Sequence, residues 1–316
     1  MIWVIVLALI AGFALFMYKM FMGFAGRPEE APRVLPEKDS PWYEFTRDYF
    51  TSVETVNSAA HENLVITSDD GLKLRGKLFK TRPDNDHVVI GFHGYQGSAE
   101  ADILRFSKMY EHAGYDYLAI SERAQNDSEG KYVTFGVKEA EDGILWCREI
   151  RKLYGEDVTV LIHGVSMGAA TVLLMSADPD LPENVKAVIS DCAYDSMMNQ
   201  AKHTMSKYPA GVLDVMLGIM DLYAKVFAGF RLKDAAPVKV IPGSRIPCLF
   251  VHGDLDDFVP RKMMDTLYKA YGGPKDFFTV KDAVHSCAFS KDPEGYEKKF
   301  MSFLEQHKLL SSTGSM

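Results

Sequence analysis

The sequence predicts an α/β domain in which helices cover both faces of a largely parallel sheet, preceded by an apolar N-terminal helix. Two observations lead to this prediction. From residue 87 onward, short apolar runs alternate with segments of helical periodicity, the pattern of parallel strands joined by crossover helices. One of those runs, residues 158–162, leads through the motif GVSMG at residues 164–168 directly into a helix-forming segment.

The composition narrows the class of protein. The 316 residues are 47% hydrophobic and 25% charged, which suits one large domain with an appendage. The formal net charge of −8 and the lack of a basic stripe predict that nucleic acid is not a partner. The four cysteines are scattered without metal-ligand spacing, so we expect buried free thiols, a usage that suits a reducing compartment.

The first residues form a candidate membrane anchor. Residues 1–18 carry no charge, and about 20 apolar residues cross a bilayer. We therefore expect a retained single-pass transmembrane anchor over residues 1–26, in contact with membrane lipid, with Lys19 snorkelling near one end. A cleaved signal peptide is the alternative, but it usually begins with basic residues, and none precedes this run. The basic residues that follow the span favour a cytoplasmic domain by the positive-inside rule; they are Lys19, Arg27, Arg33 and Lys38.

Residues 27–60 are expected to form a proline-containing linker followed by a juxtamembrane helix. Trp42, Phe45 and Tyr49 recur there at helical spacing, so the helix has an aromatic face that packs on the domain or lies on the lipid surface. The α/β domain is expected over residues 61–310, with a tail at residues 311–316. Its predicted strands cover residues 64–67, 72–79, 87–92, 115–120, 158–162, 185–190, 246–251 and 277–280, and its predicted helices include residues 103–112 and 137–154.

The segment around Ser166 has the pattern of a nucleophile elbow, namely a strand, the motif G-x-S-x-G and a helix. A serine on this tight turn adopts strained backbone angles, and side chains two positions away would clash, so Gly164 and Gly168 fit there. The turn exposes the serine Oγ and leaves the amide of Met167 free to donate at a helix N-terminus. Ser166 is the candidate nucleophile and Met167 a candidate oxyanion-hole donor. A chance match on a surface turn is the alternative.

A second glycine-rich turn, HGYQGS at residues 93–98, follows the predicted strand at residues 87–92. Acyl transfer needs two amides that converge on a carbonyl oxygen as negative charge develops there. A glycine-rich turn at the carboxyl end of a strand brings the backbone close to a substrate. We therefore expect Tyr95 to supply the second oxyanion-hole amide and to contact the substrate, although an ordinary glycine turn would have the same sequence.

A general base is sought after Ser166, because the chain order in this architecture is serine, acid, histidine. His203 lies in an apolar helical segment, and His252 lies within a strand and turn. His307 lies among polar residues of a terminal helix, where a solvated role is expected. His285 lies in a loop that follows a predicted strand, which suits a general base. His285 is therefore the candidate base.

The acid is expected at the end of the strand at residues 246–251, which runs into HGDLDDFVP at residues 252–260. The spacing H-G-x-x-D-x-x-V-P favours Asp256, with Asp254 and Asp257 forming the turn. Asp191, which follows the preceding strand, is a further candidate.

Residues 194–245 interrupt the alternation of strands and helices with many apolar residues at helical spacing. They form either a helical insert that packs on the domain or a cap over the active site, whose flexible thioethers line an acyl pocket. We expect the cap, with Met197, Met216 and Met220 as substrate-binding residues.

Together these motifs resemble the α/β-hydrolase superfamily, in particular bacterial serine esterases and peptidase-like serine hydrolases. The resemblance covers about residues 64–310, and its matching pieces are HGYQGS at 93–98, GVSMG at 164–168, HGDLDDFVP at 252–260 and AVH at 283–285. The resemblance implies an α/β-hydrolase fold with Ser166 as nucleophile, His285 as base and Asp256 as the acid that orients it.

Residues 121–128, SERAQNDS, resemble the D-x-R-G-x-G-x-S loop of that superfamily. They depart from it by carrying Glu122 for the aspartate, Ala124 for the first glycine and Asn126 for the second glycine. The departure concerns the conformation of this loop and leaves the triad unaffected.

The expected activity is hydrolysis of a small-molecule ester or other acyl substrate through a Ser-His-Asp triad and an acyl-enzyme. This chemistry requires no metal and no organic cofactor. A peptidase, a thioesterase or an acyltransferase is the alternative on the same site. A non-catalytic, membrane-anchored binding protein is the alternative of another class, and it would predict a broken triad.

Overall fold

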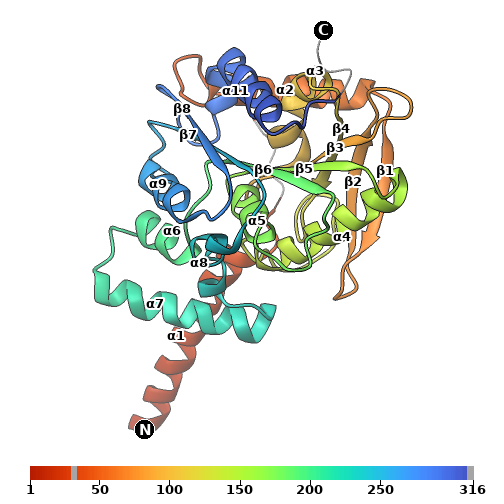
Figure 1. Ribbon diagram of the computed structural model, residues 1–316. Helices are drawn as coiled ribbons and strands as arrows, with labels where there is room; N and C mark the ends of the chain where they lie inside the picture. Colours follow the sequence, from red (N-terminus) through yellow and green to blue (C-terminus); the bar gives the residue numbers. More distant parts are fainter. Residues whose placement is uncertain (30–33, 312–316) are drawn as a thin grey trace.

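The computed structural model describes residues 1–29 and 34–311 and contains an eight-stranded sheet with helices on both faces (Figure 1). The strand order is β1-β2-β4-β3-β5-β6-β7-β8. β1 and β4 each pair with β2 in antiparallel fashion, and the other neighbouring strands are parallel. The strands are β1 (Glu62–Thr67), β2 (Lys73–Phe79), β3 (His87–Phe92), β4 (Asp116–Ser121), β5 (Thr159–Val165), β6 (Val185–Asp191), β7 (Cys248–Gly253) and β8 (Lys275–Val280).

The helices and helical turns lie between and around these strands (Figure 1). The predicted helix over residues 137–154 is confirmed as α4. The α-helices are α1 (Ile2–Ala25), α2 (Tyr43–Ser58), α3 (Ser107–His112), α4 (Val137–Tyr154), α5 (Met167–Met175), α6 (Met197–Thr204), α7 (Ala210–Tyr223), α8 (Pro237–Val240), α9 (Arg261–Ala270), α10 (Ala288–Lys291) and α11 (Pro293–Gln306). The π and 3₁₀ turns are η1 (Ala99–Ile103), η2 (Leu104–Phe106), η3 (Ala224–Ala228), η4 (Leu232–Asp234) and η5 (Ile241–Gly243).

The hydrophobic core lies on both faces of the sheet, as expected for parallel strands that are covered on both sides. In β5, Val160 and Ile162 point into the cluster that contains residues of α4 and α5. Leu161, between them, points into the opposite cluster, which contains Tyr296 and Phe300 of α11. The central strands are therefore rigid supports for the loops at their carboxyl ends.

The predicted helix over residues 103–112 differs from the structure in its first turn. The chain there forms the π turn η1 and the 3₁₀ turn η2, and the α-helix starts only at Ser107. Ser98 caps η1 by accepting a hydrogen bond from the amide of Ala101. The turn lies so close to β3 that a Cβ at Gly91 would overlap Ile103. This close approach brings Asp102 beneath the loop that follows β3.

The segment between β6 and β7 forms α6, α7, η3, η4, α8 and η5, so residues 194–245 are a helical insert. A third apolar cluster joins this insert to α1. Met17 and Phe21 of α1 are fully buried there, in the same cluster as Leu213 and Leu217 of α7. Figure 1 shows α1 projecting from the domain beside α7.

Among the described residues, α1 is long and apolar enough to cross a membrane. A membrane anchor and a signal sequence share this length and composition. Arg33, one of the basic residues after the span, lies outside the described residues, as does the predicted tail beyond Ser311.

Candidate active site

Ser166 lies on a strained turn between β5 and α5. Its backbone has φ 55° and ψ −112°, and a positive φ of this kind is uncommon for a residue with a side chain. A Cβ at Gly164 would overlap the carbonyl of Gly168, and a Cβ at Gly168 would overlap the carbonyl of Phe92. The two glycines therefore permit the sharp change of direction. The turn holds the half-buried Ser166 side chain at the carboxyl edge of the sheet.

The structure brings Ser166, His285 and Asp256 together from three loops. Ser166 Oγ lies 2.8 Å from His285 Nε2, and His285 Nδ1 lies 2.7 Å from Asp256 Oδ2. The loops meet because β5, β7 and β8 are parallel, so their carboxyl ends lie at one edge of the sheet. With Nδ1 donating to the carboxylate, Nε2 is left to accept the hydroxyl proton of the serine. This is the hydrogen-bond arrangement of a serine nucleophile, a base and an orienting acid.

Asp256 is buried and fully engaged in hydrogen bonds. Its Oδ1 accepts from the amides of Phe258 at 3.1 Å and Val259 at 2.8 Å, and His252 Nε2 lies 3.3 Å from its Oδ2. Burial on its own would raise the pKa of this carboxyl, but the hydrogen bonds and charges of His252 and His285 outweigh burial and lower it to about 2. Asp256 is therefore ionised at neutral pH.

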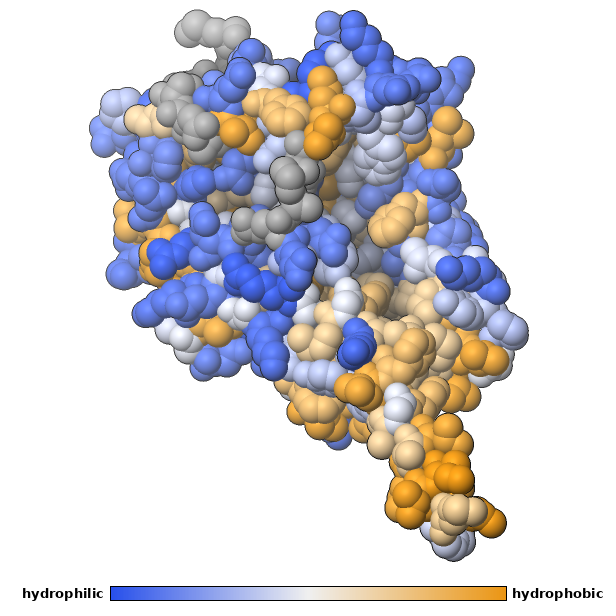
Figure 2. Space-filling model, turned by 180° about the vertical axis from the view of Figure 1, so that it is seen from behind, coloured by the Kyte–Doolittle hydropathy of each residue, from blue (hydrophilic) through white to orange (hydrophobic). Residues whose placement is uncertain are grey.

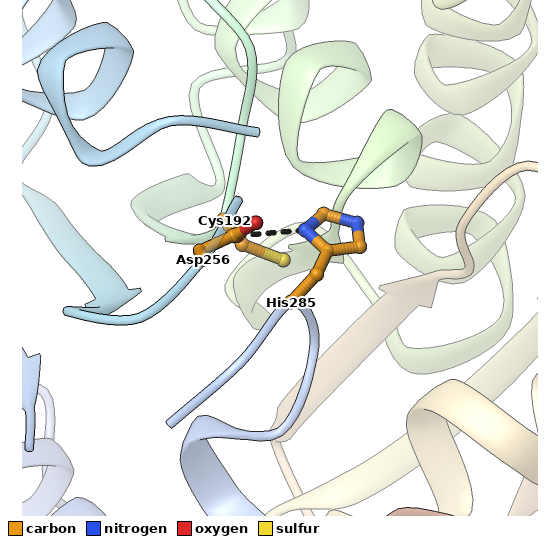
Figure 3. A group of neighbouring side chains, drawn as sticks. All are labelled: Cys192, Asp256 and His285. Atoms are coloured by element: carbon orange, nitrogen blue, oxygen red, sulfur yellow. Dashed lines mark hydrogen bonds and ion pairs between the residues drawn. The ribbon is translucent and has the colours of Figure 1, made fainter. Parts of the chain in front are cut away.

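Cys192 lies beside the Asp256–His285 pair (Figure 3). The ligand atoms of the three residues are within 4.8 Å of one another, a grouping compatible with a bound metal ion. Asp256 and His285 use their facing atoms on each other, which leaves His285 Nε2 facing Ser166 Oγ. Burial raises the pKa of the neighbouring Cys192 thiol well above its usual value.

The turn after β3 lies against the elbow. A Cβ at Gly94 would lie 3.4 Å from the Cβ of Ser166, so the backbone of this turn is adjacent to the serine. Within the described part of the chain, the amides of Tyr95 and Met167 have no hydrogen-bond acceptor. Free amides on both sides of a candidate nucleophile match the requirement of an oxyanion hole.

Three side chains hold this turn in place. Asp102 Oδ2 accepts from the amide of Gly94 at 2.7 Å, and Gln125 Oε1 accepts from the amide of Gln96 at 2.7 Å. Asn126 donates to the carbonyl of Gly97 at 3.0 Å. The sequence does not single out Asp102, because an aspartate four residues after the glycine-rich turn at residues 93–98 is a weak signal.

Ala124 and Asn126, which stand where the resembling motif has glycine, both adopt positive φ, at 58° and 47°. Left-handed backbone is costly for alanine but tolerated by asparagine. The conformation is held by a hydrogen bond from the amide of Ala124 to the carbonyl of Glu129 and by Ser128, whose hydroxyl donates to the carbonyl of Ser121. The loop therefore forms the turns that glycine favours without having glycine.

A pocket of about 770 Å³ opens at Ser166. This volume is within the range of small-molecule sites, roughly 300–1,000 Å³. An aromatic wall comes from Trp42 and from Phe45 and Tyr49 of α2, so this face packs at the site. The remaining lining comes from Pro28, Glu29, Gly94, Tyr95, Gln96, Gly97, Ser98, Asp102, Gln125, Asn126, Ser166, Phe258, His285 and Ser286.

The three predicted substrate-binding methionines are not among the residues that line this pocket. Met197 and Met220 are buried in the cluster that joins the insert to α1, and Met216 packs against that cluster. These methionines recur at helical spacing because they pack against α1 and the domain, not because they line the pocket. Phe258, which the sequence does not single out, contacts His285, and the centres of the two rings lie 4.9 Å apart.

The comparisons with known proteins show the fold. No family model matches the chain. YqkD of Bacillus subtilis is 26% identical over 265 residues, which cover 82% of this chain and 83% of YqkD. The structure of the Pyrococcus furiosus esterase Pf2001 superposes with a TM-score of 0.65 and 19% identity, covering 90% of this chain and 97% of the esterase.

The Pyrococcus horikoshii acylaminoacyl peptidase superposes with a TM-score of 0.57 and 17% identity, over 84% of this chain and 45% of the peptidase. An esterase and a peptidase thus share the same arrangement of strands and helices with this chain. The sheet order, the elbow after β5 and these superpositions show that the chain has the α/β-hydrolase fold.

Proposed function

We propose that the protein is a serine hydrolase that cleaves carboxylic esters. The observation that carries the proposal is the continuous hydrogen-bonded series from Ser166 Oγ through His285 to Asp256, with separations of 2.8 and 2.7 Å, in the wall of a pocket. A nucleophile, a base and an orienting acid in contact are the minimum machinery for acyl transfer.

In the first half of the proposed reaction, Ser166 Oγ attacks the ester carbonyl carbon while His285 Nε2 takes the hydroxyl proton. The amides of Met167 and Tyr95 donate to the oxyanion of the tetrahedral intermediate. When the intermediate collapses, the bond to the alcohol oxygen breaks, and His285 gives its proton to that oxygen. The products of this half are a free alcohol and an acyl group bonded to Ser166.

In the second half, His285 removes a proton from water, and the resulting hydroxide attacks the acyl carbonyl. Collapse of the second intermediate releases the carboxylic acid and returns the proton to Ser166. Asp256 accepts a hydrogen bond from His285 Nδ1–H throughout and stabilises the imidazolium. The lowered pKa of Asp256 keeps its carboxylate charged for this role.

The residues that line the pocket favour an uncharged, partly apolar substrate. Trp42, Phe45 and Tyr49 supply aromatic surface, and none of the described residues that line the pocket is a lysine or an arginine. An anionic substrate would lack a positively charged partner there. An uncharged ester with an apolar acyl or alcohol group matches this mainly aromatic, cation-free lining.

We also propose that α1 is a retained membrane anchor. Met17, Phe21 and Ala25 near its C-terminal end are fully buried, and the carbonyl of Phe24 accepts a hydrogen bond from the hydroxyl of Tyr95 at 2.9 Å. Cleavage after a signal sequence would remove these contacts and expose the apolar surface beneath them. The basic residues after the span support placement of the domain in the cytoplasm.

The test uses the purified full chain in detergent with p-nitrophenyl esters from acetate to laurate. Aminoacyl anilides and acyl thioesters are measured beside them. We expect ester turnover, labelling of Ser166 by a fluorophosphonate, and a loss in Ser166→Ala on the order of 10⁴-fold or more. Turnover that survives in Ser166→Ala, or a preference for anilides over esters, would contradict the proposal. The absence of a phosphonate adduct in the folded protein would favour a non-catalytic binding protein.

A further inference from the structure

The outer face of α7 is apolar although the structure leaves it exposed. Val215 is 61% exposed, and Val212 and Leu222 are about half exposed. Asp214 is the charged residue on this outer side, and its carboxylate pairs with Lys202 at 2.7 Å. A helix on the surface of a soluble domain normally turns its charged side chains outward. This face is therefore suited to an apolar environment.

The apolar surface continues from α7 into η3 and onto α1. Val226 of η3 is 65% exposed, and the ring of Phe227 lies 5.1 Å from the ring of Tyr18. The hydroxyl of Tyr223, at the end of α7, donates to the carbonyl of Ala14 at 3.2 Å. Figure 2 shows hydrophobic side chains covering the projecting helix and continuing onto the domain around its base.

We propose that the α7–η3 face, defined by Val212, Val215, Leu222, Val226 and Phe227, lies in the lipid bilayer beside α1. Both surfaces then occupy the same membrane leaflet, with α7 lying along the boundary between headgroups and acyl chains as amphipathic helices do. Leu213, Leu217 and Met220 of α7 face the protein and hold the helix on the domain.

The length of α1 supports this placement. At 1.5 Å per residue its 24 residues extend about 36 Å, and the hydrocarbon core of a bilayer is about 30 Å thick. The hydroxyl of Tyr223 in α7 reaches the carbonyl of Ala14, and the 12 residues of α1 before Ala14 extend only about 18 Å. If α1 crosses the core, roughly the last 12 Å of the crossing lies at the level of the α7–η3 face.

The charges around the face also suit a bilayer. The insert from residue 194 to residue 245 contains seven lysines and arginines and four aspartates, although the whole chain has a net charge of −8. Lys202, Lys207 and Lys225 are exposed, and the Lys207 amine lies 5.4 Å from the ring centre of Tyr208. Lysine and tyrosine at the edge of an apolar face are typical of membrane interfaces, and lysines attract anionic headgroups.

This placement has a consequence for the pocket, which rests on the proposed function. Pro28 and Glu29, which line the pocket, follow the last residue of α1 by three and four positions. The pocket mouth therefore lies close to the membrane surface when the α7–η3 face is immersed. An ester dissolved in the bilayer would reach Ser166 without crossing bulk water.

The test places an environment-sensitive nitrobenzoxadiazole label on single cysteines in the full chain. Val215→Cys and Val226→Cys report on the face, Ile5→Cys reports on α1, and Leu153→Cys is the matched control, because Leu153 is an exposed apolar residue of α4. The native cysteines are buried, and the unsubstituted protein gives the background labelling. Each variant is reconstituted in vesicles of phosphatidylcholine and phosphatidylglycerol, with or without doxyl-labelled lipid.

We expect the labels at positions 215 and 226 to shift to shorter wavelength and to be quenched by doxyl lipid several-fold more than the label at position 153. Labels at 215 and 226 that behave like the label at 153 would overturn the proposal, whether or not position 5 is quenched. Disulfide cross-linking of Val215→Cys between two copies would also overturn it, because a second protein copy would then cover the face. Hydrolysis of a short soluble ester, measured on the same samples, reports separately on the proposed function.

Discussion

Asp102 is predicted to control the rate of the chemical step by holding the turn after β3 in place. It lies buried in η1, and its Oδ2 accepts the amide hydrogen of Gly94 at 2.7 Å. Its carboxylate fits against Gly97 so closely that a Cβ there would overlap it. Asp102 is thus a positioning residue that fixes the turn carrying the amide of Tyr95 beside Ser166.

The size of the effect follows from that hydrogen bond. A hydrogen bond to a charged group contributes about 1.5–3 kcal/mol, and the substitution Asp102→Ala leaves the amide of Gly94 buried without a partner. If the hydrogen bond between Asp102 and the Gly94 amide keeps the Tyr95 amide directed at the oxyanion, loss of that bond lowers kcat by about 10- to 100-fold. Asp102→Asn keeps an acceptor of the same shape and is expected to retain most of the rate.

The assay compares kcat and KM for one short ester across the wild-type protein, Asp102→Ala and Asp102→Asn, together with the affinity for a boronic acid that mimics the tetrahedral oxyanion. We expect kcat and boronate affinity to fall in parallel while KM changes little, because the oxyanion forms only after binding. A kcat within twofold of wild type in Asp102→Ala would refute the reasoning. Equal losses in both variants, matched by equal losses in thermal stability, would reduce Asp102 to a structural residue.

Two further predictions concern stability. Burial, reinforced by neighbouring carboxylates, raises the pKa of Glu122 well above its usual value, and both of its carboxyl oxygens are buried without a partner among the described residues. The folded state therefore binds more protons than the unfolded state, so stability falls as pH rises above about 4.3. The advantage of Glu122→Gln in melting temperature should accordingly grow between about pH 5 and about pH 8, and a constant difference would contradict this. Gly168→Ala places a Cβ against the carbonyls of Phe92 and His93, so we expect its free energy of unfolding in denaturant to fall by more than about 4 kcal/mol. Gly218→Ala has open space at its Cβ, so its free energy of unfolding should rise by up to about 1 kcal/mol. Similar stabilities for the two variants would show that the elbow tolerates a side chain.

The sequence predicts the parts of the fold that depend on local patterns. The alternating runs set the strands, and the glycines at 164 and 168 mark the elbow because two side chains there would meet backbone. The proximity of His285 to Ser166 follows from chain order and from the rule that parallel strands end at one edge of the sheet. These predictions need no knowledge of which helix packs where.

The missed features depend on long-range packing. An amphipathic helix over residues 43–58 has an apolar face, but the pattern does not specify what that face meets, and in the structure Phe45 and Tyr49 line the pocket. The methionines of the insert show the opposite outcome. Met197 and Met220 have the spacing expected of residues that line a pocket, but in the structure they pack in the cluster that joins the insert to α1. Asp102 was missed because a π turn, which the pattern did not indicate, brings it under Gly94.

The end of the proposed anchor is bonded into the loops that support the candidate active site. Arg27 donates through its amide to the carbonyl of Lys131 at 2.8 Å and through its guanidinium to the carbonyls of Asn126 and Ser128. Asn126 in turn donates to the carbonyl of Gly97, within the turn that carries the Tyr95 amide. A short series of hydrogen bonds thus links the residues that follow α1 to the candidate oxyanion hole. If α1 is the proposed anchor, the same residues connect the position of the protein on the bilayer to the geometry of the oxyanion hole.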